Sequence, residues 1–276
     1  MTKFFSMSHE FIEIAAATDP GNVRQFNEDS IRSNPEIGVA ILADGMGGHR
    51  AGEVASDMAT QVIMNALQTQ VTGFRSVAAP HSLLRAVEQS INRVNAAVFD
   101  AAQARPSYQG MGTTLALTLF YDNRVALGHI GDSRIYRLRN DVLHLLTRDD
   151  SLLRDQIELG FISVASAGES HNRSLVTQAL GIEGTVSAHL REDEARPDDI
   201  YVLCSDGLHD LVEDADIALI VAALKGNLPL AANHLVQTAK DYGGYDNVSV
   251  ILVKVRNPFP ATSHRRWFSR LFGWFK

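Results

Sequence analysis

The residues best suited to chemistry are acidic side chains that stand beside glycine or asparagine in short motifs far apart along the 276-residue chain. One such pair alone is typical of a plain turn, because Asp-Gly is among the commonest turn sequences. If the carboxylates converge, their mutual repulsion raises their pKa values and opposes folding unless a cation lies among them. Together they therefore predict a metal site, formed by Asn27-Glu28-Asp29, Asp44-Gly45, Gly131-Asp132, Ser205-Asp206-Gly207 and Asp246-Asn247.

The expected ion is hard, because carboxylate and carbonyl oxygens without nearby His or Cys ligands favour Mg²⁺ or Mn²⁺. Gly45 would let the chain approach closely and turn its carbonyl toward the ion. Two ions ~4 Å apart can share and deprotonate one water, which then attacks a phosphoester in line without a covalent enzyme intermediate. Apolar runs directly precede Asp44 and Asp206, so both would stand at the ends of rigid strands.

Competing chemistries fail on the same residues. Gly45-Met46-Gly47-Gly48 lacks the Lys-Ser/Thr of a P-loop, and Arg50 stands where a dinucleotide fingerprint needs its last Gly. No calcium loop with the required acidic spacing is present. A cysteine nucleophile of the tyrosine-phosphatase type would want an arginine six positions after Cys204, where the chain has Asp210. We therefore expect Cys204, the only cysteine, to be a buried strand thiol in a reducing compartment.

The composition is that of a folded soluble protein, with 45% hydrophobic and 21% charged residues. A formal charge of -7 argues against nucleic acid as the main partner, since that affinity comes from Lys and Arg contacts to phosphates. The first residues lack the apolar stretch of a secretory signal, and no run approaches the ~18 residues of a spanning helix. The sequence therefore predicts a cytoplasmic protein.

The elements that must position the acidic motifs come in consecutive groups of strands, which favours antiparallel sheets with flanking helices in an α+β fold. Residues 147–175 are polar and poorly periodic and lie between strand groups, so we expect an inserted flap there. Three-to-four spacing predicts helices around 54–66 and 84–98, and further helices are expected near 215–224 and 228–241. Strands are expected at 11–18, 37–43, 113–120, 124–130, 133–139, 186–190, 200–205 and 248–255.

Collected in chain order, these motifs resemble the type 2C, metal-dependent serine/threonine phosphatases in their bacterial form. The resemblance covers roughly residues 10–255. It is carried by six motifs: Arg24-x-x-Asn27-Glu28-Asp29, Ala43-Asp44-Gly45-Met46-Gly47-Gly48-His49, Gly112-Thr113-Thr114, Gly131-Asp132-Ser133-Arg134, Ser205-Asp206-Gly207-Leu208 and Asp246-Asn247-Val248-Ser249-Val250.

The resemblance implies a central antiparallel β-sandwich with helices on both outer faces, in four αββα layers. It implies that Asp44 bridges two Mn²⁺ or Mg²⁺ ions, that the Gly45 carbonyl binds one of them, and that Asp206 and Asp246 bind the other. Glu28 and Asp29 would hold water beside the ions. Asp132 with Asp206 matches the site of a third metal, and Arg24 would clamp the substrate phosphate.

Two departures from the family pattern affect catalysis and substrate choice. Many eukaryotic relatives have a histidine, proposed as proton donor, where this chain has Met46, which cannot donate a proton. His49 or a water on the metal are the remaining candidates for the general acid. In the flap, Arg148-Asp149-Asp150-Ser151 replaces an Asp-His-Ser sequence that relatives often carry. We therefore expect substrate selection to differ there.

Residues 257–276 change character after Asn257-Pro258-Phe259-Pro260. On a helical projection, Trp267, Phe268, Leu271, Phe272, Trp274 and Phe275 share one face, and a basic face lies opposite. The pattern is typical of an amphipathic helix on an anionic membrane surface, here the inner face, through residues 264–276. The alternatives are docking on a partner protein, packing on the chain's own core, and disorder.

We therefore expect a catalytic domain over residues 1–256 and a basic amphipathic tail over 257–276. The expected activity is hydrolysis of phosphoserine and phosphothreonine in proteins, opposing a cytoplasmic Ser/Thr kinase. The alternatives are a catalytically silent regulatory or phosphoprotein-binding relative and a phosphatase of small phosphoesters. The first is disfavoured because Asp44, Asp206 and Asp246 are all retained.

Overall fold

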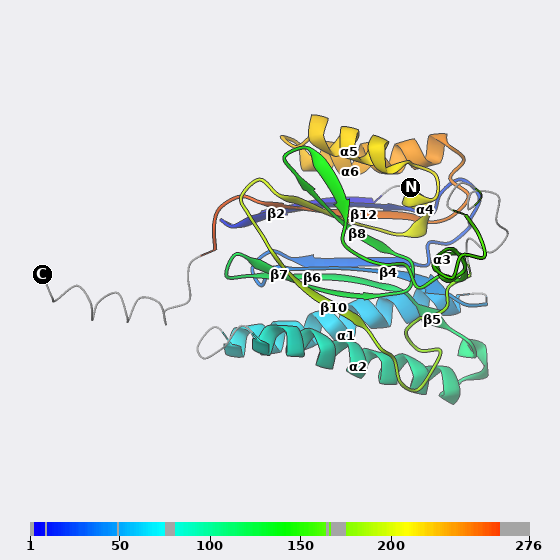
Figure 1. The fold of residues 1–276 in the computed structure, drawn as a ribbon. Helices are drawn as coiled ribbons and strands as arrows, with labels where there is room; N and C mark the ends of the chain where they lie inside the picture. The colour runs from blue at the N-terminus through cyan, green and yellow to red at the C-terminus, as the bar shows by residue number, and fades with distance from the viewer. Residues whose placement is uncertain are drawn as a thin grey trace, which may run out of the picture.

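Two antiparallel β-sheets stack face to face in the computed structural model, and a pair of helices covers the outer face of each sheet (Figure 1). The structure describes residues 3–8, 10–48, 50–74, 81–163, 166 and 175–259. The predicted α+β sandwich with helices on both faces is confirmed. None of the helices within the described residues has the length and apolarity that a bilayer-spanning segment needs.

The first sheet places the last strand of the chain in its interior. Its strands follow the order β1 (Lys3–Ser8), β2 (Ile12–Asp19), β12 (Val248–Val255), β11 (Ile200–Cys204), β8 (Arg134–Arg139) and β9 (Val142–Leu145). Every neighbouring pair is antiparallel. Helices α5 (Asp214–Ala223) and α6 (Leu228–Asp241) lie over the outer face, where they appear at the top of Figure 1.

The second sheet is covered by the two longest helices, α1 (Ala51–Phe74) and α2 (His81–Ala104), which lie below it in Figure 1. Its strand order is β10 (His189–Glu194), β7 (Arg124–Ile130), β6 (Leu115–Tyr121), β4 (Val39–Met46) and β3 (Asp29–Asn34). The short strand β5 (Gly112–Thr113) pairs with the end of β4, and a single 3-10 turn spans Pro106–Tyr108.

Apolar side chains fill three layers, because each sheet is buried on both of its faces. On β12, Val250 and Leu252 join the cluster under α5 and α6, whereas Ile251 and Val253 join the cluster between the sheets. A strand buried on both faces has an apolar run in place of an alternating one. This explains the nearly continuous hydrophobic sequence of β12.

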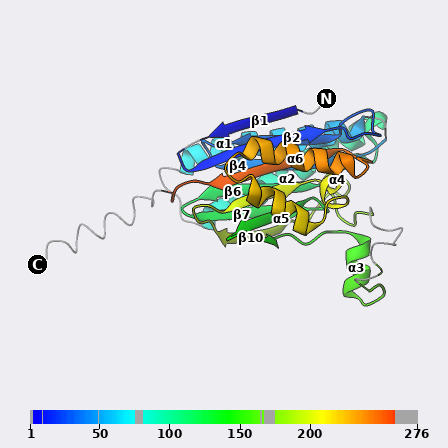
Figure 2. The same ribbon diagram turned by 90° about the horizontal axis from the view of Figure 1, so that it is seen from above.

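The predicted flap between β9 and β10 contains one helix that the sequence did not predict, α3 (Leu152–Glu158). Its first turn is capped by Ser151, whose Oγ accepts a hydrogen bond from the Arg154 backbone N–H at 3.3 Å. Arg148 bridges to Glu158 at 2.7 Å and so ties the start of the flap to the end of the helix. Viewed from above, α3 projects away from the body of the sandwich (Figure 2).

Most of the predicted strands and all four predicted helical regions are confirmed. The strand expected at 186–190 was partly wrong, because pairing with β7 begins only at His189. Besides α3 and the 3-10 turn, the described elements that were missed are β1, β3, β9 and the short helix α4 (Asp206–His209).

Candidate metal centre

The acidic residues singled out in the sequence meet at one end of the sandwich. Asp29 begins β3 and lies directly opposite Asp44 of β4 in the antiparallel register. Asp132 occupies the turn between β7 and β8, Asp206 follows β11, and Asp246 precedes β12. Because antiparallel neighbours bring the end of one strand beside the start of the next, residues distant in sequence share this edge.

Electrostatics show how closely the carboxylates approach. Burial raises the pKa of Asp44 well above its usual range, and the negative charges of Asp29, Asp206, Asp132 and Asp246 raise it further. Mutual repulsion was predicted to raise these pKa values, but the loss of solvent on burial is the larger cause. The predicted convergence of the carboxylates is observed.

The neighbours of Asp44 are perturbed in the same direction. Burial, with the charge of Asp206, raises the pKa of Asp29 to about 7, although Ser205 Oγ donates to Asp29 Oδ2 at 2.9 Å. Burial and the same neighbour raise the pKa of Asp132 to about 7. The pKa of Asp206 is also raised by burial, and the negative charge of Asp246 raises it further.

Three carboxylate oxygens at the site are buried without a hydrogen-bond partner: Glu28 Oε1, Asp29 Oδ1 and Asp206 Oδ1. Buried acceptors are costly unless something satisfies them, and a divalent cation would do so for several at once. The donor set is all oxygen, which fits Mn²⁺ or Mg²⁺. Within the described residues, however, no three His, Cys, Asp or Glu side chains already form the ligand set of one ion. Asp246, for example, is engaged elsewhere.

Asp246 is paired with Arg24, whose guanidinium Nη2 lies 2.7 Å from Asp246 Oδ2. Both side chains are partly exposed, Arg24 by 54% and Asp246 by 39%. The pair therefore forms the outer, solvent-facing part of the site, while Asp44 and Asp206 lie beneath it. An ion that drew the Asp246 carboxylate away from the guanidinium would free Arg24 for an incoming anion.

The Gly112-Thr113-Thr114 motif fixes the backbone of Asp44. Thr114 Oγ1 accepts from the Asp44 N–H at 2.9 Å, and Thr113 Oγ1 donates to the Asp44 carbonyl at 2.8 Å. Thr114 Oγ1 also lies 2.6 Å from Ser133 Oγ, so the same hydroxyl reaches the turn that carries Asp132. The two threonines thus fix the Asp44 backbone and link it to the turn that carries Asp132.

Asn247 joins the first and last acidic motifs of the chain. Its Oδ1 accepts from the Glu28 N–H at 2.7 Å, and its Nδ2 donates to the carbonyls of Pro20 and Phe26 at 3.1 and 2.9 Å. The adjacent Asp246 is thereby held beside the loop of Arg24. This explains why the site needs an asparagine after the aspartate.

Two glycines at the site have no room for a side chain. A Cβ on Gly45 would lie 2.1 Å from the Gly52 carbonyl oxygen and 2.6 Å from that of Glu28. A Cβ on Gly207 would lie 2.0 Å from the Asn247 carbonyl oxygen. Gly45 thus permits close backbone approach to Gly52 and Glu28, and Gly207 permits the same behind Asp206.

Sequence reasoning missed one buried residue at the centre, His209. Its Nε2 lies 3.0 Å from the Asp132 carbonyl oxygen, and the side chain is only 3% exposed. The imidazole partly offsets the pKa shifts of Asp132 and Asp206. The place of His209 three residues after Asp206 on one helical turn was the available signal. His49, the candidate proton donor, lies outside the described residues.

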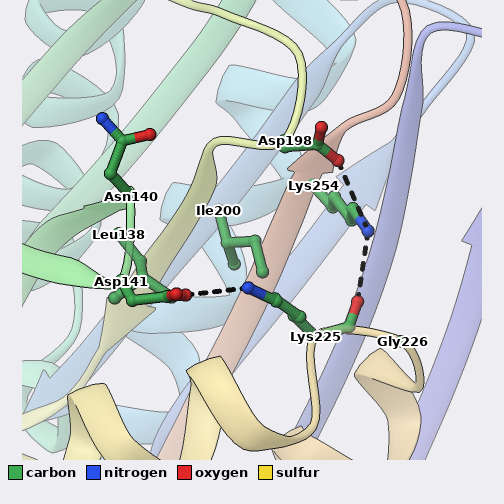
Figure 3. A pocket seen from close by; sticks show the side chains of 8 residues that line it. All are labelled: Leu138, Asn140, Asp141, Asp198, Ile200, Lys225, Gly226 and Lys254. Carbon is green, nitrogen blue, oxygen red and sulfur yellow. Dashed lines mark hydrogen bonds and ion pairs between the residues drawn. The ribbon is translucent and has the colours of Figure 1, made fainter.

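A separate cavity of about 430 Å³ lies at the opposite ends of the same strands, where β8 finishes and β11 begins (Figure 3). Its two lysines are already paired. Lys225 Nζ lies 2.9 Å from Asp141 Oδ1, and Lys254 Nζ lies 3.8 Å from Asp198 Oδ1. With its charges neutralised in this way, the cavity does not compete with the carboxylate cluster as a site for phosphate chemistry.

Comparison with known proteins decides the family. The family model described as protein phosphatase 2C matches residues 22–228. The chain belongs to this family. The Listeria innocua serine/threonine phosphatase stp is 35% identical over 240 residues, which cover 86% of this chain and 93% of that protein.

Solved structures of family members agree with the fold. The crystal structure of the Mycobacterium tuberculosis serine/threonine phosphatase PstP/Ppp has a TM-score of 0.81 at 35% identity and covers 90% of this chain and 100% of that one. A structure of the catalytic domain of PstP in complex with two manganese ions has a TM-score of 0.79 at 35% identity, covering 90% and 99%. The chain is thus a phosphatase of the type 2C class, as predicted.

Proposed function

We propose that this protein hydrolyses phosphoserine and phosphothreonine in proteins by means of water activated between two divalent metal ions, Mn²⁺ or Mg²⁺. The observation that carries the proposal is the cluster of Asp44, Asp206 and Asp29, whose pKa values are all raised and in which Asp29 Oδ1 and Asp206 Oδ1 are buried oxygens without a partner. The relative that binds two manganese ions supports the number and kind of ion. When bound, the ions supply Lewis acidity and a water deprotonated at neutral pH.

Each residue at the site has a proposed role. Asp44 bridges the two ions, the Gly45 carbonyl ligates one, and Asp206 with Asp246 ligates the other. Glu28 and Asp29 orient water from behind. Asp132, with Asp206, holds a third ion. These roles are supported by the raised pKa values of Asp44, Asp29 and Asp206 and by the hydroxyl and amide groups that fix the backbones of the motifs.

Arg24 is the proposed phosphate-binding residue. Its guanidinium is half-exposed beside Asp246 at the edge of the cluster, and once released from that carboxylate it would donate two hydrogen bonds to a phosphate dianion. His49 is the proposed proton donor to the leaving oxygen. A serine or threonine alkoxide needs such a donor, because it is a poor leaving group.

Phosphate release from phosphothreonine and phosphotyrosine peptides, measured with Mn²⁺ and with chelator, tests the proposal. We expect release from the phosphothreonine peptide that requires Mn²⁺ and is lost in Asp206→Asn while the variant stays folded by circular dichroism. Asp198→Asn, at the far end of the sandwich, is the matched control and should keep its activity. Release that survives chelation, or full turnover by Asp206→Asn, contradicts the mechanism.

We also infer that the enzyme opposes a Ser/Thr protein kinase in the cytoplasm. A single cysteine, Cys204, which is fully buried, supports a reducing compartment. Residues 1–256 are the proposed catalytic domain, with the flap at about 147–175.

The proposed role of residues 264–276 in the tail is weak, reversible contact with the inner face of the membrane. Its aromatic and basic sequence supports that role, although the residues from 260 onward lie outside those described. Co-sedimentation with anionic liposomes should be seen for the full chain and lost for residues 1–256, and equal binding by both contradicts it.

A further inference from the structure

Exposed aromatic side chains gather on the two loops that carry Arg24 and Asp246. Phe26 is 45% exposed in the loop between β2 and β3, and Tyr245 is 66% exposed in the loop between α6 and β12. Of the four aromatic side chains that are exposed in the described part of the chain, only Phe161 lies elsewhere, since Tyr242 is also on the second loop. Exposed aromatics concentrated at one place mark a binding surface.

The two loops form one continuous surface. The Asn22 backbone N–H donates to the Gly244 carbonyl at 2.7 Å, and Asn22 Nδ2 donates to the carbonyls of Lys240 and Gly243 at 2.8 and 3.0 Å. Together with the Arg24–Asp246 pair, these bonds connect the loops at both ends. We call the exposed side chains of Val23, Phe26 and Tyr245 on this surface the aromatic rim.

The rings of the aromatic rim are held although they face solvent. The Arg50 guanidinium carbon lies 4.4 Å from the centre of the Phe26 ring, a cation–π contact. The Tyr245 ring lies against Gly243, where an added Cβ would come within 2.5 Å of ring atoms. Side chains already fixed in this way lose little conformational entropy when a ligand covers them. The rim is therefore preorganised for binding.

We propose that the aromatic rim binds large apolar side chains on either side of the phosphorylated residue, so that the preferred substrates are phosphopeptides with apolar flanks. The inference rests on the proposed function, in which Arg24 holds the phosphate. Val23 and Phe26 stand one and two residues from Arg24, and Tyr245 is adjacent to Asp246. Successive residues are 3.8 Å apart, so the rim is within reach of residues next to the phosphorylated one.

The test compares two phosphothreonine peptides that differ only at the positions flanking the phosphothreonine, Leu or Phe in one and Gly in the other. With Mn²⁺, we expect kcat/KM to be about 10-fold higher for the apolar peptide, the effect of partly burying one such side chain. The double variant Phe26→Ala/Tyr245→Ala should bring this ratio close to one. Phe26→Leu should retain part of it, because it keeps an apolar surface.

Leu219→Ala is the matched control, because Leu219 is 67% exposed but lies on α5, away from both loops. It should keep the wild-type ratio. Equal kcat/KM for the two peptides with the wild-type enzyme, or an unchanged ratio in the double variant, overturns the rim proposal and leaves the proposed function standing. If neither peptide is hydrolysed while p-nitrophenyl phosphate is, both proposals are wrong.

Discussion

Replacing Asp132 by Asn should stabilise the chelator-treated protein, and the gain should grow as the pH rises. The reason is that Asp132 is only 6% exposed and its pKa is raised from 3.8 to about 7 by burial and by the charge of Asp206. An asparagine of nearly the same shape carries no charge at any of these pH values. The substitution therefore removes the electrostatic cost without opening a cavity.

The magnitude follows from proton linkage. Below about pH 4 the carboxyl is protonated in both the folded and the unfolded protein, so its ionisation costs nothing. Between about pH 4 and 7 the unfolded chain has released the proton and the folded chain has not, so the free energy of unfolding falls as the pH rises. Above pH 7 the free-energy cost of ionising Asp132 in the folded protein is constant at about 4 kcal/mol. This is the difference between pKa values of 3.8 and about 7, since one pKa unit corresponds to ~1.4 kcal/mol.

Urea unfolding in the presence of chelator at pH 5, 6, 7 and 8 measures this cost. The stability difference between Asp132→Asn and wild type should rise by about 2.5 kcal/mol from pH 5 to pH 8. Asp241→Asn, at the exposed end of α6, controls for the loss of one negative charge from the protein as a whole. A second series with saturating Mn²⁺ should show a smaller difference, because a cation offsets the charge of the wild-type carboxylate.

A stability difference that stays the same from pH 5 to pH 8 would refute the reasoning. It would mean that the Asp132 carboxylate is solvated or paired in the folded protein, and that it is not confined beside Asp206. The proposed third ion would then lose its main support.

Three other substitutions test separate parts of the site. Gly45→Ala should lower the free energy of unfolding by about 3 kcal/mol, since its Cβ would lie 2.1 Å from the Gly52 carbonyl oxygen, whereas Gly48→Ala, with open space around it, should be close to neutral in thermal melts. Thr114→Val removes the hydroxyl that accepts from the Asp44 N–H, so Mn²⁺ affinity measured by titration calorimetry should fall roughly 10- to 100-fold, and unchanged affinity would contradict the role. Arg24→Lys keeps the charge but loses the paired donors, so kcat/KM for a phosphothreonine peptide should fall by about 10²-fold in steady-state assays; wild-type kinetics would exclude phosphate binding by Arg24.

The strands predicted best from the sequence were those whose own apolar side chains identify them as buried strands. The nearly continuous apolar run of β12, rich in Val, predicted a strand, and the structure buries it on both faces. By contrast, β3 is polar and half-buried along its whole length, and it is a strand because β4 pairs with it. Such tertiary pairing leaves no local signal. The hairpin of β8 and β9 did have a local signal, the Asn140-Asp141 pair. Both residues adopt positive φ in its turn, as such a turn requires.

At the site, the sequence predicted the identities of the acidic residues but not their connections. Acidic residues in five separate motifs indicated that their carboxylates converge. Because buried strands precede several of them, the carboxylates were also expected to stand at rigid strand ends. The pairing of Arg24 with Asp246 and the contact of His209 with Asp132 depend on distances between loops, which no spacing encodes. The aromatic rim was missed for a related reason, since Phe26 and Tyr245 are 219 residues apart and belong to no shared pattern.

The interior place of β12 bears on when the enzyme becomes active during its synthesis. The ribosome must release residues 242–255 before the first sheet can close, because β2 pairs on one side with this late strand. Asp246 and Asn247, which complete the site, emerge at the same moment. A nascent chain that ends before residue 246 therefore has an incomplete sheet and an incomplete centre. Chains cut short before β12 by proteolysis or stalled translation should accordingly be inactive.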